Sequence, residues 1–186
     1  MKKVYLITRN KGKLDAARHA FAEHGIKVLQ IKKDYPEIQS DKNIDVARYA
    51  AKMAAKEHDA PVIREDHGFY INALSGFPGP YGNYFERTIS SENILEMMKG
   101  AKDRRAYFVL AAALAFPDGK VKEFVHEVHV EISDKVQGGK GNWDDIIMLP
   151  GAKKTFSQTP DDEWTLYWTK NFEEIARYLE GKKIWR

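Results

Sequence analysis

The fold is decided near the start of the chain, where the sequence reads Val4-Tyr5-Leu6-Ile7-Thr8-Arg9-Asn10-Lys11-Gly12-Lys13-Leu14. Val4 to Thr8 is a short run of strand-forming residues, and Asn10 stands where a helix N-cap is expected. An apolar stripe at helical spacing continues to a stop at Gly25, and Ile26 to Ile31 then alternates like a second strand. A strand, a helix and a strand in this order predict an α/β protein.

The rest of the chain adds a helix and longer strands to this start. An alanine-rich helix is predicted from about Asn43 to His58, and Pro61 to Ile63 begins a third strand that ends in an acidic turn. Arg105 to Phe116 and Val121 to Ile132 are predicted to be long strands joined by a hairpin turn. We therefore expect α/β architecture with a long mixed, partly antiparallel sheet rather than a plain doubly wound one.

Composition excludes several classes of protein. The chain has 186 residues with a net charge of +3, and its basic residues form no concentrated patch, so duplex nucleic acid is not an expected partner. No apolar run approaches the ~20 residues of a membrane span, and the first residues are too short for a signal peptide, so a cytoplasmic protein is expected. The absence of cysteine removes thiolate nucleophiles, disulfides and cysteine-based zinc sites.

The first candidate site is the loop between the opening strand and its helix. Thr8 and Asn10 can donate hydrogen bonds, and Lys13 lies about one turn into a helix whose N-terminus favours an anion. These residues are typical of a phosphate-binding loop, although the spacing is not that of a Walker A motif. The alternative is a capped helix with solvated lysines.

The second candidate site is acidic. Glu65 and Asp66 follow the third strand directly, and Glu37 lies in the irregular segment upstream. Carboxylates that converge at strand ends suit Mg²⁺, and one of them could instead deprotonate a water molecule. The alternative is that they are ordinary surface acids.

The third candidate site is aromatic. Trp143 and Asp144 follow a glycine-rich loop, and Trp164, Tyr167 and Trp168 belong to the last predicted helix. A nucleotide base could stack on an indole while Asp144 accepts a hydrogen bond from the base or sugar. Packing of these rings in the core is the main alternative, and for Trp143 the sequence leaves the choice open.

The order of these motifs resembles the inosine triphosphate pyrophosphatase family. The matching segments cover nearly the whole chain: Thr8-x-Asn10-x-x-Lys13, Tyr35-Pro36-Glu37, Ala51-Lys52, Glu65-Asp66-x-Gly68-Phe69, Gly76-Phe77-Pro78-Gly79-Pro80-Tyr81, Ala106-Tyr107-Phe108, Trp143-Asp144 and Thr155-Phe156. The resemblance implies a single two-lobed domain over residues 1–186, a nucleotide cleft between the lobes and usually a homodimer.

The resemblance also implies roles for individual residues. Thr8, Asn10 and Lys13 would hold the phosphates of a nucleoside triphosphate, and Lys52 would neutralise its charge. The expected metal ligands are Glu37, Glu65 and Asp66, with Mg²⁺ as cofactor. Asp66 best matches the acid that activates the attacking water. This agrees with the chemistry of phosphoryl transfer, which needs positive charge, a metal and a positioned water.

The chain departs from the family pattern at several positions. Arg9 replaces a glycine and His67 a small hydroxyl residue, while Gly141 replaces an aromatic residue. The family's base-reading Ser-His-Arg triplet aligns with Leu166-Tyr167-Trp168, and acids around Asp162 replace a lysine. A site without these donors cannot reject bases by leaving polar groups unpaired, so base specificity is expected to be shifted or relaxed.

Three functions remain open at the level of sequence. The first is Mg²⁺-dependent hydrolysis of a nucleoside triphosphate to the monophosphate and pyrophosphate. Retention of the acids and of Lys52 favours it. The second is a non-catalytic paralogue that binds a nucleotide or a partner, which Arg9 and His67 favour. The third, a phosphatase acting on another phosphorylated metabolite, has less support.

Overall fold

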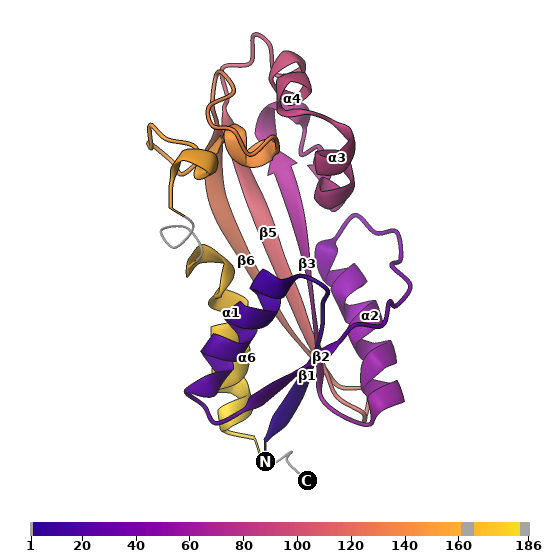
Figure 1. Cartoon of the computed structure of the whole chain (residues 1–186). Coiled ribbons are helices and arrows are strands. Elements are labelled where there is room, and N and C mark those ends of the chain that lie inside the picture. Colours follow the sequence, from indigo (N-terminus) through magenta and orange to yellow (C-terminus); the bar gives the residue numbers. More distant parts are fainter. Residues whose placement is uncertain (1, 161–165, 183–186) are drawn as a thin grey trace. The chain divides into compact units, whose positions relative to one another are not determined.

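The computed structural model of the protein describes residues 2–160 and 166–182, which form both strands and helices (Figure 1). The strands are β1 (Lys3–Ile7), β2 (Lys27–Ile31), β3 (Val62–Ile71), β4 (Pro78–Gly79), β5 (Arg105–Ala115), β6 (Val121–Ile132) and β7 (Ile147–Met148). The α-helices are α1 (Lys11–Ala22), α2 (Asn43–His58), α3 (Gly82–Thr88), α4 (Ser91–Met97) and α6 (Lys170–Glu180). Short 3-10 helices are η1 (Asn72–Leu74), η2 (Trp143–Asp145), η3 (Phe156–Gln158) and η4 (Leu166–Trp168).

The strands form one mixed sheet. Its order is β2-β1-β3-β5-β6-β7, and β4 pairs with β3 as the seventh strand. β1 runs parallel to both β2 and β3, whereas β7 is antiparallel to β6 and β4 is antiparallel to β3. The predicted mixed α/β sheet is therefore confirmed.

The chain divides into two compact units. Unit 1 comprises Met1–Asp66, Leu110–His126 and Trp168–Arg186, and unit 2 comprises His67–Val109 and Glu127–Tyr167. The expected single domain with a cleft between its lobes stays a prediction. No helix in the described part of the chain is long and apolar enough to cross a membrane.

Unit 1 buries both faces of its part of the sheet. On one face, α1 and α6 pack together through apolar side chains such as Phe21, Phe172 and Ile175. On the other face lies α2, whose alanines pack against Ile7 and Val62. Figure 1 shows α2 on the opposite side of the strands from α1 and α6. Because side chains alternate along a strand, each residue of β3 in this unit faces either α1 and α6 or α2.

The third strand is longer than the sequence predicts. The polar run from Arg64 to Gly68 was expected to be a turn after a strand that ends at Ile63, but β3 continues through it to Ile71. Pairing explains the difference, because Ile7 of β1 is in register with Arg64, and Phe69 and Tyr70 pair with β4. Sheet neighbours thus hold an extended backbone that the local sequence does not favour.

The start of the last predicted helix lies partly outside the described residues. Trp164 of that predicted helix is among residues 161–165, which fall outside the described ranges. The continuous helix that the structure describes, α6, begins at Lys170 and ends at Glu180.

Candidate functional site

The loop between β1 and α1 is a capped turn. The Oδ1 atom of Asn10 accepts a hydrogen bond from the Lys13 N–H at 3.1 Å, and the Thr8 hydroxyl oxygen accepts one from the Asn10 N–H at 3.1 Å. The Gln30 side chain of β2 donates to the Thr8 carbonyl at 2.9 Å. The predicted N-cap at Asn10 is thus confirmed. The loop is pre-arranged at a helix end whose first N–H groups have no partner within the helix.

Lys13 reaches from this helix to the acids of β3. Its Nζ lies 3.5 Å from Oε2 of Glu65, and its side chain is about one-quarter exposed (24%). Burial lowers the pKa of Lys13 below the usual value for lysine, while the nearby Glu65 and Asp66 carboxylates offset part of that shift. The structure therefore brings Lys13 together with both acids, as the sequence hypothesis requires.

Glu65 faces α1 and α6 and is almost fully buried. Its Oε1 accepts a hydrogen bond at 2.9 Å from Nδ2 of Asn171 on α6. Asn171 is itself completely buried, and the same amide donates to the Leu110 carbonyl at 3.2 Å. Both neighbours are acceptors, so the amide orientation follows from its surroundings. Glu65 therefore lies in an interior polar cluster with Lys13 and Asn171.

Asp66 and Arg64 face the other side, toward α2. Oδ2 of Asp66 accepts a hydrogen bond at 2.6 Å from Nδ2 of Asn43, the first residue of α2. A short bond of this kind to a carboxylate fixes its orientation. The orientation of Asp66 is thus set by a neutral donor, while Lys13 interacts electrostatically with its carboxylate.

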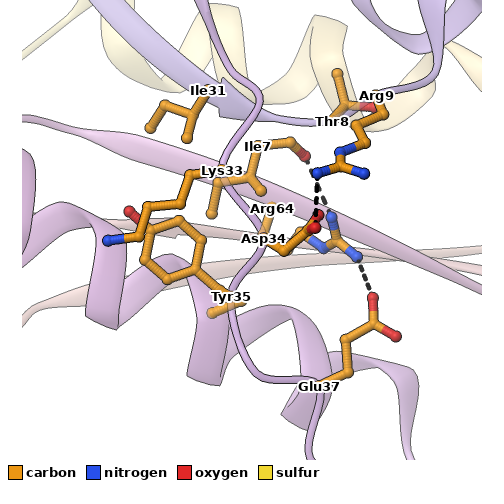
Figure 2. Close-up of a pocket in the computed structure, with 10 residues that line it drawn as sticks. Ile7, Thr8, Arg9, Ile31, Lys33, Asp34, Tyr35, Glu37 and Arg64 are labelled. Carbon is orange, nitrogen blue, oxygen red and sulfur yellow. Dashed lines mark hydrogen bonds and ion pairs between the residues drawn. The ribbon is translucent and has the colours of Figure 1, made fainter.

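A small pocket opens on this α2 side of unit 1 (Figure 2). Its volume is about 40 Å³, enough for an ion or a water molecule or two. Arg64 donates from Nη2 to Oε1 of Glu37 at 2.7 Å across the pocket. Tyr35 lines it as well, and burial together with a hydrogen bond to Glu57 raises the pKa of Tyr35 to about 12.

Arg9 does not enter the phosphate loop as a bulky free cation. Its guanidinium donates to Asp34 at 2.6 Å (Figure 2). It also donates to the Lys32 carbonyl at 3.2 Å, and both acceptors follow β2 in the sequence. The side chain is 70% exposed. Arg9, the departure from the family pattern that favoured a non-catalytic protein, thus forms a surface ion pair beside the loop.

The three expected metal ligands do not form one ligand set in the free protein. Among the described residues, no three Asp, Glu, His or Cys side chains are gathered closely enough to hold a metal ion. Alternation along β3 turns Glu65 away from Asp66, and Glu37 is paired with Arg64. Mg²⁺ in proteins needs only one or two carboxylates when substrate phosphates complete its shell. Glu37 and Asp66, which share the α2 side, fit that requirement, whereas Glu65 does not.

Lys52 lies outside this cluster. Its side chain is exposed on α2, and it makes no hydrogen bond or ion pair with any residue that the structure describes. The structure does not bring it to the other candidate residues of unit 1.

The aromatic candidate belongs to unit 2. Trp143 is only 3% exposed, its indole N–H donates to the Ile89 carbonyl at 2.9 Å, and its ring lies 5.7 Å from that of Phe69. The structure favours the core alternative for Trp143, since no broad ring face is exposed for a base. Asp144 is half-buried, with Oδ2 3.3 Å from Nζ of Lys140. Tyr167 is 37% exposed.

Sequence reasoning missed three residues that organise the unit 1 site. They are Asn43, which holds Asp66, Asn171, which holds Glu65, and Arg64, which holds Glu37. Only Asn171 carried a visible signal, as an amide within the apolar stripe of the last helix. The other two looked like ordinary polar residues at element ends.

Comparison with known proteins agrees with the motif order. The chain is 40% identical over 185 residues to a dITP/XTP pyrophosphatase of Ignicoccus hospitalis, with 97% of this chain and 98% of that protein covered. It is 38% identical to the dITP/XTP pyrophosphatase of Methanopyrus kandleri, with 96% and 97% covered. The solved Ham1 protein of Staphylococcus aureus superposes with a TM-score of 0.80 at 28% identity, covering 98% of this chain and 100% of that one. The sequence profile of the Ham1 family matches residues 4–166. The chain belongs to the Ham1 family.

Proposed function

We propose that this protein hydrolyses a nucleoside triphosphate to the nucleoside monophosphate and pyrophosphate, with Mg²⁺ as its cofactor. The observation that carries the proposal is the meeting of Lys13 with the acids of β3 at the N-terminus of α1. Curated relatives that match over nearly the whole chain are dITP/XTP pyrophosphatases, which supports the same reaction class.

The phosphates would bind at the capped loop. The hydroxyl of Thr8, the amide of Asn10 and the N–H groups of the first turn of α1 supply neutral donors, and Lys13 supplies a charge. An anion bound there would further stabilise the charged form of Lys13, which burial disfavours. Lys52 would contribute at longer range from its exposed position on α2.

Asp66 is the proposed general base. It would take a proton from the water that attacks the α-phosphorus, the bond to the bridging oxygen would break, and pyrophosphate would leave. Asn43 keeps the receiving carboxylate oriented. Glu37 and Asp66 are the residues that would hold Mg²⁺. When bound with the phosphates, the metal supplies charge neutralisation and polarises the phosphoryl oxygens.

Base specificity is proposed to be shifted or relaxed. The position of the family's base-reading triplet carries Leu166-Tyr167-Trp168, which offers an aromatic surface but few donors. A base held mainly by stacking is discriminated weakly, because no buried polar group is left unpaired by the wrong base. The homodimer and the cytoplasmic location that the resemblance implies stay predictions.

Pyrophosphate release from a panel of natural and deaminated nucleoside triphosphates, with Mg²⁺ and with a chelator, tests the proposal. Asp66→Asn should lower kcat by about 10²- to 10⁴-fold, the range of general acid–base catalysis. The matched control is Asp118→Asn in the exposed turn between β5 and β6, where the carboxylate pairs with Lys120. Full activity of Asp66→Asn would refute the assignment. Binding of a nucleotide without turnover of any would favour the non-catalytic alternative.

A further inference from the structure

Arg64 occupies a special place beside the proposed site. It lies on the α2 face of β3, two residues before Asp66, and lines the pocket of Figure 2. Its side chain is 20% exposed, whereas that of its partner Glu37 is 66% exposed. The guanidinium is thus fixed on a strand, while the carboxylate comes from an irregular segment at the surface.

The guanidinium has more donors than the free protein uses. Nη2 donates to Glu37 at 2.7 Å, and Nη1 reaches the Ile7 carbonyl only at 3.5 Å. Nε is buried, and it has no acceptor among the described residues. A buried donor without an acceptor is unfavourable, so an anionic oxygen placed there would bind favourably.

The other cations that line the pocket have satisfied partners. Arg9 donates to Asp34 and to a backbone carbonyl, and Lys33 lies 2.6 Å and 2.8 Å from the two carboxylate oxygens of Glu57. In the part of the chain that the structure describes, Arg64 is the pocket cation with an orphaned buried N–H. A phosphate oxygen entering this pocket would therefore meet Arg64 as its unsatisfied donor.

The ion pair with Glu37 is weak enough to open. Because Glu37 is mostly exposed, solvent screens the pair, and its net contribution to stability is small. Arginine binds phosphate with two parallel N–H donors, which a single carboxylate oxygen does not match. Exchange of the Glu37 carboxylate for a phosphate would thus give the Arg64 guanidinium more hydrogen bonds than it loses.

We propose that Arg64 is a substrate-binding residue that exchanges partners: it leaves Glu37 for a phosphate oxygen of the incoming polyphosphate, and Glu37 becomes free for the Mg²⁺ that accompanies it. This inference rests on the proposed function. Charge stays balanced throughout, because a paired cation and anion of the protein receive an anion and a cation of the substrate. The exchange also explains how Glu37 can be a metal ligand although an arginine holds it in the free protein.

Two binding measurements without turnover test the exchange on Arg64→Met. Pyrophosphate binding by calorimetry in a chelating buffer should weaken at least about tenfold, the value of a lost charge-assisted hydrogen bond. Binding of Mn²⁺ alone, read by electron paramagnetic resonance, should instead tighten by about two- to fivefold, because Glu37 is released from a weak pair. Arg64→Lys, which keeps the charge but loses the planar fork, should fall between wild type and Arg64→Met for pyrophosphate.

The matched control is Arg48→Met. Arg48 lies in the same unit and pairs with Asp45 and Glu123, but it does not line the pocket. The affinities of Arg48→Met for pyrophosphate and for Mn²⁺ should equal those of the wild type. Opposite shifts for the two ligands support the exchange, whereas equal shifts in one direction, or none, overturn it. If the opposite shifts occur but the wild type hydrolyses no nucleotide, the proposed function fails and the phosphate contact of Arg64 stands.

Discussion

Asn171 provides the sharpest test of the interior cluster behind the site. It is a completely buried amide on α6 that donates to the Glu65 carboxylate and to the Leu110 carbonyl. Replacement by leucine keeps a side chain of similar size and removes both donors. Glu65 would then keep its charge in the same buried place with one hydrogen bond fewer.

The size of the effect follows from the contacts. The bond to the carboxylate contributes about 1.5–3 kcal/mol and the bond to the carbonyl about 1 kcal/mol. Against this, Oδ1 of Asn171 is buried and has no donor among the described residues, so its removal returns about 1 kcal/mol. Asn171→Leu should therefore lower the free energy of unfolding by about 1.5–3 kcal/mol, which for a chain of this size is roughly 3–12 °C in Tm.

Urea unfolding followed by circular dichroism measures this loss of stability. A second variant, Asn171→Asp, predicts in addition how the loss changes with pH. The introduced carboxyl lies against Glu65, so its pKa in the folded state is raised above the usual ~3.9. A raised carboxyl pKa means that the folded state binds more protons, so stability falls as pH rises above about 4. The deficit of Asn171→Asp should thus be larger at pH 7.5 than at pH 5. Wild-type stability of Asn171→Leu, or a deficit of Asn171→Asp that does not change with pH, would refute the reasoning.

Three further predictions concern the site residues themselves. Asn43→Ala should lower kcat by about tenfold or more with little change in KM, because Asp66 loses the donor that orients it; steady-state pyrophosphate release measures this. Burial lowers the pKa of Lys13, so pyrophosphate binding should be accompanied by proton uptake as the pH rises toward 10.5, the usual pKa of lysine. Calorimetry in buffers of different ionisation enthalpy detects this uptake, and Lys13→Met should abolish it. Trp143→Phe should lower the stability by about 1 kcal/mol, through loss of the bond to Ile89, and leave the order of preferred bases unchanged in the substrate panel.

Local sequence was sufficient to predict those features that depend only on residues close by in the sequence. The cap at Asn10 uses an N–H only three residues away, and the helix of α2 has the bounds that its alanine pattern predicts. The length of β3 depends instead on strands that pair with it from distant parts of the chain. Its polar segment has no strand pattern of its own, so the sequence could not predict that it is extended.

The candidate site was predictable only in part, because some of its residues are brought together by adjacent parallel strands and others only by the tertiary fold. β1 and β3 are parallel neighbours with Ile7 opposite Arg64, so the residues that follow Ile7 lie beside the acids of β3. β1 ends at Ile7, and the acids of β3 directly follow its register partner Arg64, so the loop after β1 lies beside them although β3 continues to Ile71. Asn171 is 106 positions from Glu65 and comes from the last helix, so only the tertiary fold could place it there.

The pair Glu65-Asp66 shows why the surroundings of each residue in a motif of adjacent acids have to be considered separately before chemistry is assigned. Two neighbouring residues of a strand point to opposite faces, so they experience different surroundings however similar their side chains are. Glu65 enters the interior, where a buried charge is tolerated only with partners such as Asn171 and Lys13. Asp66 faces the α2 side, where Nδ2 of Asn43 donates a hydrogen bond to its carboxylate. One acid therefore stabilises the charge of Lys13 beside the loop, and the other is the acid for which we propose the chemistry.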